Sequence, residues 1–333
     1  MKKEISLTGI KPTGNPHIGN YLGAIKPALE LEKSGKYDSR YFIADYHALN
    51  TIKDGKRLKS LTYEIAATWL AFGLDPEKTI FYKQSDVPET FELSTFLSAF
   101  TAKGLMNRAH AYKASVDKNR LANKDNDFGI NIGLFTYPIL MAADILLFNS
   151  DVVPVGKDQV QHIEIAADIA QAINHNYKKE LLTVPKPLIN EKNELIIGLD
   201  GRKMSKSYNN IIPLFLPPKK LRKLIMKIVT NSQGVEEVKD PATCNIFALY
   251  KLFATQEEQD LLAKRYRAGG LGWGHAKQEL FEKLDQFLSP YRENYNQIIS
   301  DTTYMDKILD EGAEKARDIA SKTISRLRKA SGL

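Results

Sequence analysis

Cysteine is almost missing from this sequence. Cys244 is its only cysteine in 333 residues, so a single chain cannot form an internal disulfide, a cysteine-ligated zinc site or an iron–sulfur cluster. Such sparse use of cysteine is typical of proteins that work in a reducing cytoplasm. We therefore expect a cytoplasmic protein.

Long hydrophobic runs are missing as well. The most apolar window, residues 135–148, contains Asp144 and is shorter than the ~20 residues that a helix needs to cross a bilayer. The charged first residues are not followed by the apolar stretch of a signal peptide. We expect neither secretion nor a membrane anchor.

A strong charge imbalance is also lacking. The chain has 47 Lys and Arg against 40 Asp and Glu, a net charge of +7, which is compatible with a polyanionic partner without indicating one. Its 43% hydrophobic and 26% charged residues predict a folded protein with one large or two medium domains. We find no internal repeat and no low-complexity tract.

The hydrophobic pattern changes along the chain. Short β-rich runs alternate with helical patterns in the first half, which predicts βαβ units and a parallel sheet, whereas only helices are predicted after about residue 219. We therefore expect an α/β domain with a parallel sheet over residues 1–210 and an α-helical domain over residues 211–333, with a hinge near Pro217 and Pro218. The expected strands are Ile5–Thr8, Tyr41–Ala44, Thr79–Lys83 and Val152–Val155.

A glycine-bearing loop follows the first expected strand. It runs from Gly9 to Asn20 and opens a helix, and such a turn can receive phosphate on free backbone N–H groups. His17 and Asn20 lie three residues apart, on one face of the first helical turn. The plain alternative is a turn made by Gly and Pro with an ordinary helix cap.

A second motif, Lys-Met-Ser-Lys-Ser at residues 203–207, lies on a loop that begins with Gly198. Its two ammonium groups could neutralise the charge that develops on a departing pyrophosphate. The alternative is a solvated basic loop.

Together the two motifs resemble the signatures of class I aminoacyl-tRNA synthetases, with Asn20 in place of the final histidine of the first. The resemblance implies that residues 1–210 form a Rossmann-like catalytic domain and that the helical domain of residues 211–333 binds the tRNA anticodon. It also implies activation of an amino acid by ATP, with Mg²⁺ accompanying the nucleotide and no dedicated metal site, and then transfer to tRNA. No covalent nucleophile is required, so rate comes from positioning and charge stabilisation. The implied catalytic residues are His17, Asn20, Lys203 and Lys206. The implied ATP-binding residues are Lys11, Pro12, Thr13, Gly19, Asn20, Gly156, Lys157, Asp158, Ile196, Lys203, Met204, Ser205, Lys206 and Ser207.

One helix carries residues suited to an aromatic amino acid. We expect it to begin with Thr136 as its cap and Pro138 in its first turn. Tyr137, Met141 and Asp144 then share one face, where Met141 can pack against a ring and Asp144 can accept a hydrogen bond from an indole N–H. The alternative is a core helix in which Asp144 caps or pairs with a lysine.

Residues 137–146 look like the amino-acid-binding helix of the tryptophan branch of this family, whereas the tyrosine branch generally has Gln at position 141. This resemblance places Asp144, Tyr137, Met141, Gln159 and His47 around L-tryptophan. It implies ATP, L-tryptophan and tRNA(Trp) as substrates and a homodimer, with no membrane partner. Lys11 departs from the family's usual Gln, and whether it would hold the substrate carboxylate or the ATP phosphates stays open.

Two basic clusters in the helical half are candidates for tRNA contact, unless they are only solvated helix faces. The clusters consist of Lys219, Lys220, Arg222, Lys223 and Lys227, and of Lys322, Arg326, Arg328 and Lys329. The Phe91–Phe100 helix is a candidate dimer interface or part of the core.

Three other functions stay open. The protein could be a tyrosyl-tRNA synthetase, a class I nucleotidyltransferase or a non-enzymatic paralogue. In a non-enzymatic paralogue, erosion of His17 or of residues 203–207 would be expected.

Overall fold

The computed structural model describes residues 3–189 and 196–333, which form two compact units. Unit 1 comprises residues 1–13, 26–191 and 301–333, and unit 2 comprises residues 14–25 and 192–300. This division differs from the expected boundary at residues 210 and 211, because each unit combines segments that are distant in the sequence. The first glycine-bearing loop passes from one unit to the other between Thr13 and Gly14.

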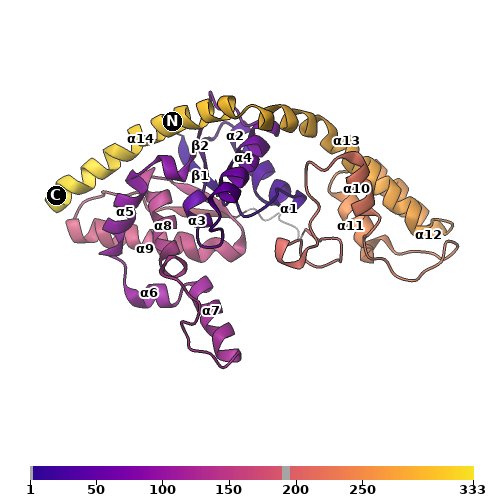
Figure 1. Ribbon diagram of the computed structural model, residues 1–333, viewed down its shortest axis with the longest axis horizontal. Helices are drawn as coiled ribbons and strands as arrows, with labels where there is room; N and C mark the ends of the chain where they lie inside the picture. Colours follow the sequence, from indigo (N-terminus) through magenta and orange to yellow (C-terminus); the bar gives the residue numbers. More distant parts are fainter. Residues whose placement is uncertain (1–2, 190–195) are drawn as a thin grey trace. The chain divides into compact units, whose positions relative to one another are not determined.

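Unit 1 contains the sheet and most of the helices that surround it (Figure 1). Its strands are β1 (Glu4–Ile10), β2 (Tyr37–Ile43), β3 (Ile80–Lys83), β4 (Val152–Val155) and β5 (Lys186–Ile189). Its helices are α2 (Lys26–Lys33), α3 (Asp45–Ala48), α4 (Gly55–Ala71), α5 (Glu89–Ser98), α6 (Lys103–Asn107), α7 (His110–Leu121), α8 (Ile132–Leu147), α9 (Val160–Tyr177) and α14 (Thr302–Ser331). The helices of unit 2 are α1 (Ile18–Asn20), α10 (Pro218–Ile225), α11 (Asn245–Lys251), α12 (Gln256–Ala268) and α13 (Trp273–Ser300).

The expected parallel sheet is confirmed. The described strands form a five-stranded sheet in the order β3-β2-β1-β4-β5, and every pairing is parallel. The strand order changes direction between β1 and β4, and in open α/β sheets ligands bind beyond the carboxyl ends of the strands at such a point. The carboxyl ends of β1 and β4 lead directly to Lys11 and Gly156.

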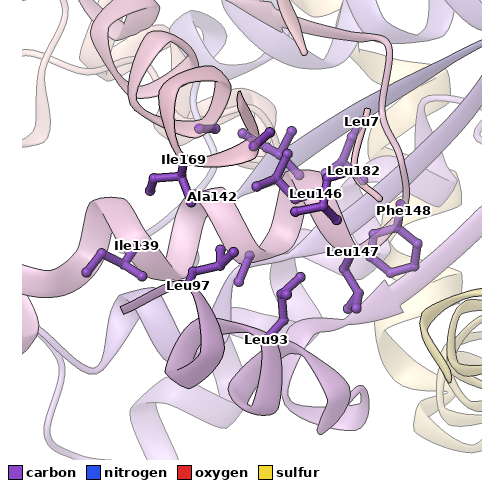
Figure 2. Close-up of a cluster of buried hydrophobic side chains, with 14 of the residues drawn as sticks. Leu7, Leu93, Leu97, Ile139, Ala142, Leu146, Leu147, Phe148, Ile169 and Leu182 are labelled. Atoms are coloured by element: carbon purple, nitrogen blue, oxygen red, sulfur yellow. The ribbon is translucent and has the colours of Figure 1, made fainter. Parts of the chain in front are cut away.

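The core of unit 1 surrounds α8. This helix packs between α5 on one side and α9 on the other, which explains why it is apolar on nearly every face. Figure 2 shows Leu93 and Leu97 of α5 on one side of α8 and Ile169 of α9 on the other, with Leu146 buried near Leu7 of β1. Asp144 is therefore a buried carboxylate on a helix whose other buried residues are apolar.

The start of α8 differs from the expectation. The helix begins at Ile132, where the Asn131 side chain accepts a hydrogen bond from the Leu134 N–H at 2.8 Å. Thr136 is inside the helix, donating its hydroxyl to the Ile132 carbonyl at 2.9 Å, and Pro138 lies beyond the first turn. Asn131 supplies a better cap one turn earlier, and this cap overrides the signal at Thr136.

The long carboxyl-terminal helix α14 packs along the edge strand β3. A Cβ atom placed on Gly312 would lie 1.8 Å from the Phe81 carbonyl oxygen, so only glycine permits this approach of helix to strand. Covering an edge strand removes a surface that could pair with another chain.

Unit 2 is organised around α13, against which α10 and α11 pack. The Phe215 and Tyr295 rings stack with centroids 3.9 Å apart, and Phe287 contacts both Tyr21 and Phe253. Among residues 3–189 and 196–333, no helix combines the length and the hydrophobicity needed to cross a membrane.

Candidate active site

The first motif forms a short helical turn in unit 2. His17 precedes α1, and the Asn20 side-chain oxygen accepts a hydrogen bond from the His17 backbone N–H at 3.1 Å. A Cβ atom on Gly19 would lie 3.0 Å from the His17 ring, so this glycine allows the imidazole to lie close to the helix. His17 is buried, at 7% exposure.

The second motif is a loop organised by Asn210. The buried amide of Asn210 donates to the Asp200 carboxylate at 2.7 Å and to the Lys203 carbonyl at 3.1 Å, and its oxygen accepts from the Ser205 N–H at 2.8 Å. The hydrogen bond from Asn210 is the largest of the effects that lower the pKa of Asp200. Asn210 stands in the motif region of the sequence, but only its contacts reveal that it holds the loop together.

The two motifs meet within unit 2. The Lys206 Nζ atom donates to the Gly14 carbonyl at 2.9 Å, and the Ile18 N–H donates to the Ile212 carbonyl at 3.0 Å. Burial, and then the positive charge of Lys206, lower the pKa of His17 to about 4, so its imidazole is neutral at pH 7. A neutral imidazole, an amide and an ammonium group can together stabilise an anionic oxygen.

A cavity of about 590 Å³ opens at the carboxyl ends of the strands in unit 1, a volume in the range of small-ligand sites. All five residues expected around the amino acid line it, and so does Lys11. The lining residues with polar side chains are Lys11, His47, Asn50, Thr51, Asn131, Tyr137, Asp144 and Gln159.

Asp144 is the most deeply buried polar group of this cavity, at 2% exposure. Its Oδ2 atom lies 3.0 Å from His47 Nε2, and Gln84 Nε2 donates to both carboxylate oxygens at 2.8 and 2.9 Å. Burial raises the pKa of Asp144, while its hydrogen bonds to His47 and Gln84 act in the opposite direction. The partners of Asp144 are thus His47 and Gln84, and not the lysine that the alternative interpretation required.

Gln84 was not identified from the sequence. It follows β3 directly, just as Lys11, Gly156 and the helix of His47 follow β1, β4 and β2. The signal that could have identified Gln84 is its place as a polar residue at the carboxyl end of a parallel strand.

Tyr137 and Met141 form another part of the wall. The Tyr137 hydroxyl is hydrogen-bonded to His162 Nε2, and burial raises the pKa of Tyr137 to about 12, so the phenol stays neutral. Met141 is partly buried against the apolar core. Gln159 lies at the end of the 3₁₀ turn Lys157–Gln159 that precedes α9.

The expected ATP-binding residues divide between the units. Lys11, Pro12, Thr13, Gly156 and Lys157 belong to unit 1, where Pro12 is buried and Lys157 is exposed. The side chain of Asp158 lies outside the part of the chain that the structure describes. Unit 2 holds Gly19, Asn20, Ile196, Lys203, Met204, Ser205, Lys206 and Ser207. The Ile196 carbonyl accepts a hydrogen bond from the Met204 N–H at 2.8 Å.

The two basic clusters also lie in different units. The first, here named the α10 cluster (Lys219, Lys220, Arg222, Lys223 and Lys227), is exposed on unit 2. The second lies on α14 in unit 1, where Arg328 binds Glu92 through two contacts of 2.6 and 2.7 Å and Arg326 donates to Asn149. Its arginines are thus engaged in holding α14 against the rest of unit 1.

The expected Phe91–Phe100 helix lies largely in α5. Leu93 and Leu97 place one face of α5 in the core of unit 1.

Comparison with known proteins assigns the family. A protein-family model described as tRNA synthetases class I (W and Y) matches residues 2–289 of the sequence. The chain is 50% identical over 328 residues to the tryptophan–tRNA ligase of Xanthomonas axonopodis pv. citri, covering 98% of this chain and 76% of the relative. It is 48% identical over 334 residues to the tryptophan–tRNA ligase of Neisseria meningitidis serogroup A, covering 100% of this chain and 99% of the relative.

A solved structure agrees with these relatives. The crystal structure of tryptophanyl-tRNA synthetase from Campylobacter jejuni, complexed with ADP and tryptophan, matches with a TM-score of 0.90 and 44% sequence identity. The match covers 98% of this chain and 99% of that one. The protein therefore belongs to the class I tRNA synthetases of the tryptophan and tyrosine group.

Proposed function

We propose that this protein is the ligase that joins L-tryptophan to tRNA(Trp). The tryptophan carboxylate attacks the α-phosphorus of ATP, the bond to the β-phosphate breaks, and tryptophanyl-adenylate and pyrophosphate form. The acyl group then passes to the 3′-terminal adenosine of the tRNA, and AMP leaves. The proposal is supported by relatives about 50% identical over nearly the whole chain, all of them tryptophan–tRNA ligases.

The polarity of the unit 1 cavity is the structural observation that carries this proposal. Among the described residues that line it, Asp144 has the only carboxylate and Lys11 the only ammonium group. Tryptophan offers an indole N–H to the first and a carboxylate to the second. In this arrangement Met141 packs against the indole ring. Of the two roles left open for Lys11, this polarity supports contact with the substrate carboxylate.

Three further residues complete the proposed tryptophan site. Gln159 and the neutral Tyr137 hydroxyl offer acceptors to the substrate ammonium group. His47, hydrogen-bonded to Asp144, holds that carboxylate at the indole end. Tyrosine would bring a phenol to this site. Asp144 could accept its O–H, but the apolar thioether of Met141 offers the phenol oxygen no hydrogen-bond donor.

The residues of the two motifs would bind the polyphosphate in unit 2. Lys203 and Lys206 would neutralise charge on the departing pyrophosphate, while His17 and Asn20 would donate hydrogen bonds to phosphate oxygens. Ammonium and hydroxyl groups suit phosphate rather than a divalent cation, so Mg²⁺ would enter with ATP and be held mainly by its phosphates.

The tRNA is proposed to contact unit 2 through the α10 cluster, whose five cations are exposed. In this proposal the helices after residue 211 read the anticodon, and the protein acts in the cytoplasm as a homodimer. Sedimentation equilibrium tests the dimer, because a dimer has twice the mass of the 37.5 kDa chain.

Aminoacylation of defined transcripts tests the proposed function. With ATP, Mg²⁺ and labelled tryptophan, we expect the protein to charge a tRNA(Trp) transcript and to leave a tRNA(Tyr) transcript uncharged. Charging of tRNA(Tyr) with tyrosine, or no charging of either transcript by a folded preparation, would contradict the proposal.

A further inference from the structure

The turn that follows β3 holds two parts of the candidate tryptophan site at once. It comprises Gln84, Ser85 and Asp86 and begins where β3 ends. Gln84 is completely buried, at 0% exposure. This position lies outside both signature motifs, and the turn itself does not line the cavity.

Gln84 holds the carboxylate of Asp144. Its amide nitrogen donates to both oxygens, at 2.8 and 2.9 Å, which fixes the plane of the carboxylate. Its own oxygen is buried and has no hydrogen-bond partner among the described residues. A buried oxygen without a hydrogen-bond partner costs free energy. The orientation of the Gln84 amide is therefore set by its contacts with Asp144, and not by the hydrogen bonds that its own oxygen could form.

Ser85 holds the helix that carries His47. The Ser85 backbone N–H donates to Asp45 Oδ1 at 3.0 Å, and its hydroxyl donates to Asp45 Oδ2 at 2.5 Å. Asp45 is the first residue of α3, and His47 lies two residues later in the same helix. Neighbouring residues of one turn therefore position both members of the His47–Asp144 pair.

The position of the turn is fixed from the other side. β3 runs into it, and α14 packs against β3 at Phe81, where Gly312 allows contact with the strand backbone. The donors of the turn therefore face Asp144 and Asp45 from a strand that is held between β2 and α14.

We propose that Gln84 is a positioning residue for tryptophan specificity, which holds Asp144 as an oriented hydrogen-bond acceptor for the indole N–H. The inference rests on the proposed function, in which Asp144 contacts the indole. A carboxylate on an apolar helix tends to take up a proton, and a protonated carboxyl could present its O–H to the ligand. The amide N–H₂ group of Gln84 can only donate hydrogen bonds. Its two contacts with Asp144 therefore favour the ionised carboxylate, which accepts hydrogen bonds, and they fix its orientation.

The test compares tryptophan with its benzothiophene analogue, in which sulfur replaces the indole N–H. Gln84→Met keeps the side-chain length and removes the donor, and Gln171→Met makes the same change at an exposed position of α9. We expect Gln84→Met to lower kcat/KM for tryptophan in pyrophosphate exchange by about 10-fold to 100-fold, mainly through KM. The KM for ATP and the kinetics of the analogue stay near wild type, as do all parameters of Gln171→Met.

The outcomes separate this inference from the proposed function. An equal loss for tryptophan and the analogue, or wild-type discrimination between them in Gln84→Met, overturns the role of Gln84. Wild-type discrimination in an Asp144→Asn protein overturns the indole contact itself and the inference with it. If Gln84→Met does not fold, Gln84→Leu removes the amide donor with a smaller apolar side chain and adds no ionisable group. The same loss of discrimination is then expected, and a folded Gln84→Leu protein that discriminates like wild type overturns the proposal.

Discussion

Asp144→Asn separates the binding role of the buried carboxylate from its effect on stability. The substitution keeps the shape of the side chain and removes its charge. Hydrogen bonds to charged groups contribute about 1.5–3 kcal/mol, so losing the charged acceptor for the indole N–H lowers kcat/KM for tryptophan by about 10-fold to 150-fold. The benzothiophene analogue offers no N–H, so its kinetics change much less.

Stability is expected to move differently. Burial raises the pKa of Asp144 above its ordinary 3.8, so the folded state binds this proton more tightly than the unfolded state does. The contribution of Asp144 to the free energy of unfolding therefore falls as pH rises above 3.8. Asn carries no charge to bury, and the unpartnered oxygen of Gln84 can turn to accept its amide N–H. The Asn protein should be at least as stable as wild type at pH 7.

Two assays on one preparation decide the matter. Pyrophosphate exchange gives kcat/KM for tryptophan and for the analogue, and urea unfolding gives the free energy of unfolding at pH 7. We expect a tryptophan-specific loss with no loss of stability. Exchange kinetics within twofold of wild type would refute the indole contact, and a large drop in stability would refute the account of a destabilising buried charge.

Further predictions concern the packing and the motifs. Gly312→Ala should lower the free energy of unfolding by about 1–3 kcal/mol in urea melts, although alanine favours helices, whereas Gly274→Ala in open space on α13 should raise it by up to about 1 kcal/mol. His17 has a pKa of about 4 when folded and 6.5 ordinarily, so stability falls as pH drops from 6.5 towards 4, and His17→Asn should flatten this decline in a pH series of melts. Asn210→Ala should loosen the second motif and raise the KM for ATP in exchange assays by at least tenfold, with the KM for tryptophan little changed. Neutralising the α10 cluster should weaken tRNA binding and make its salt dependence shallower, while exchange without tRNA stays the same.

Local signals in the sequence predict much of the fold. β1 and β4 are short β-rich runs between turn residues, and their surroundings in the sheet reinforce the same preference. The long helices α4, α13 and α14 have apolar faces with helical spacing. β5 was missed because Pro187 interrupts a four-residue strand.

Contacts between distant residues account for what the sequence did not reveal. Gln84 and Asp144 are 60 positions apart, and no periodicity connects a residue after a strand with the middle of a helix. The discontinuous units have the same cause, since residues 14–25 join unit 2 through backbone hydrogen bonds to Ile212 and Leu214. The motif residues and part of the cavity lining were suggested by the sequence because they stand in short local strings, whereas Asn50, Thr51 and Asn131, which also line the cavity, were not among the expected residues.

Pyrophosphate exchange measured with each of the twenty amino acids tests the central claim most directly. The account predicts that tryptophan alone supports rapid ATP-dependent exchange, because in the proposed site the buried carboxylate would accept from an indole N–H and the ammonium group would bind the substrate carboxylate. Exchange that is faster with tyrosine, or equally fast with several amino acids, would contradict it.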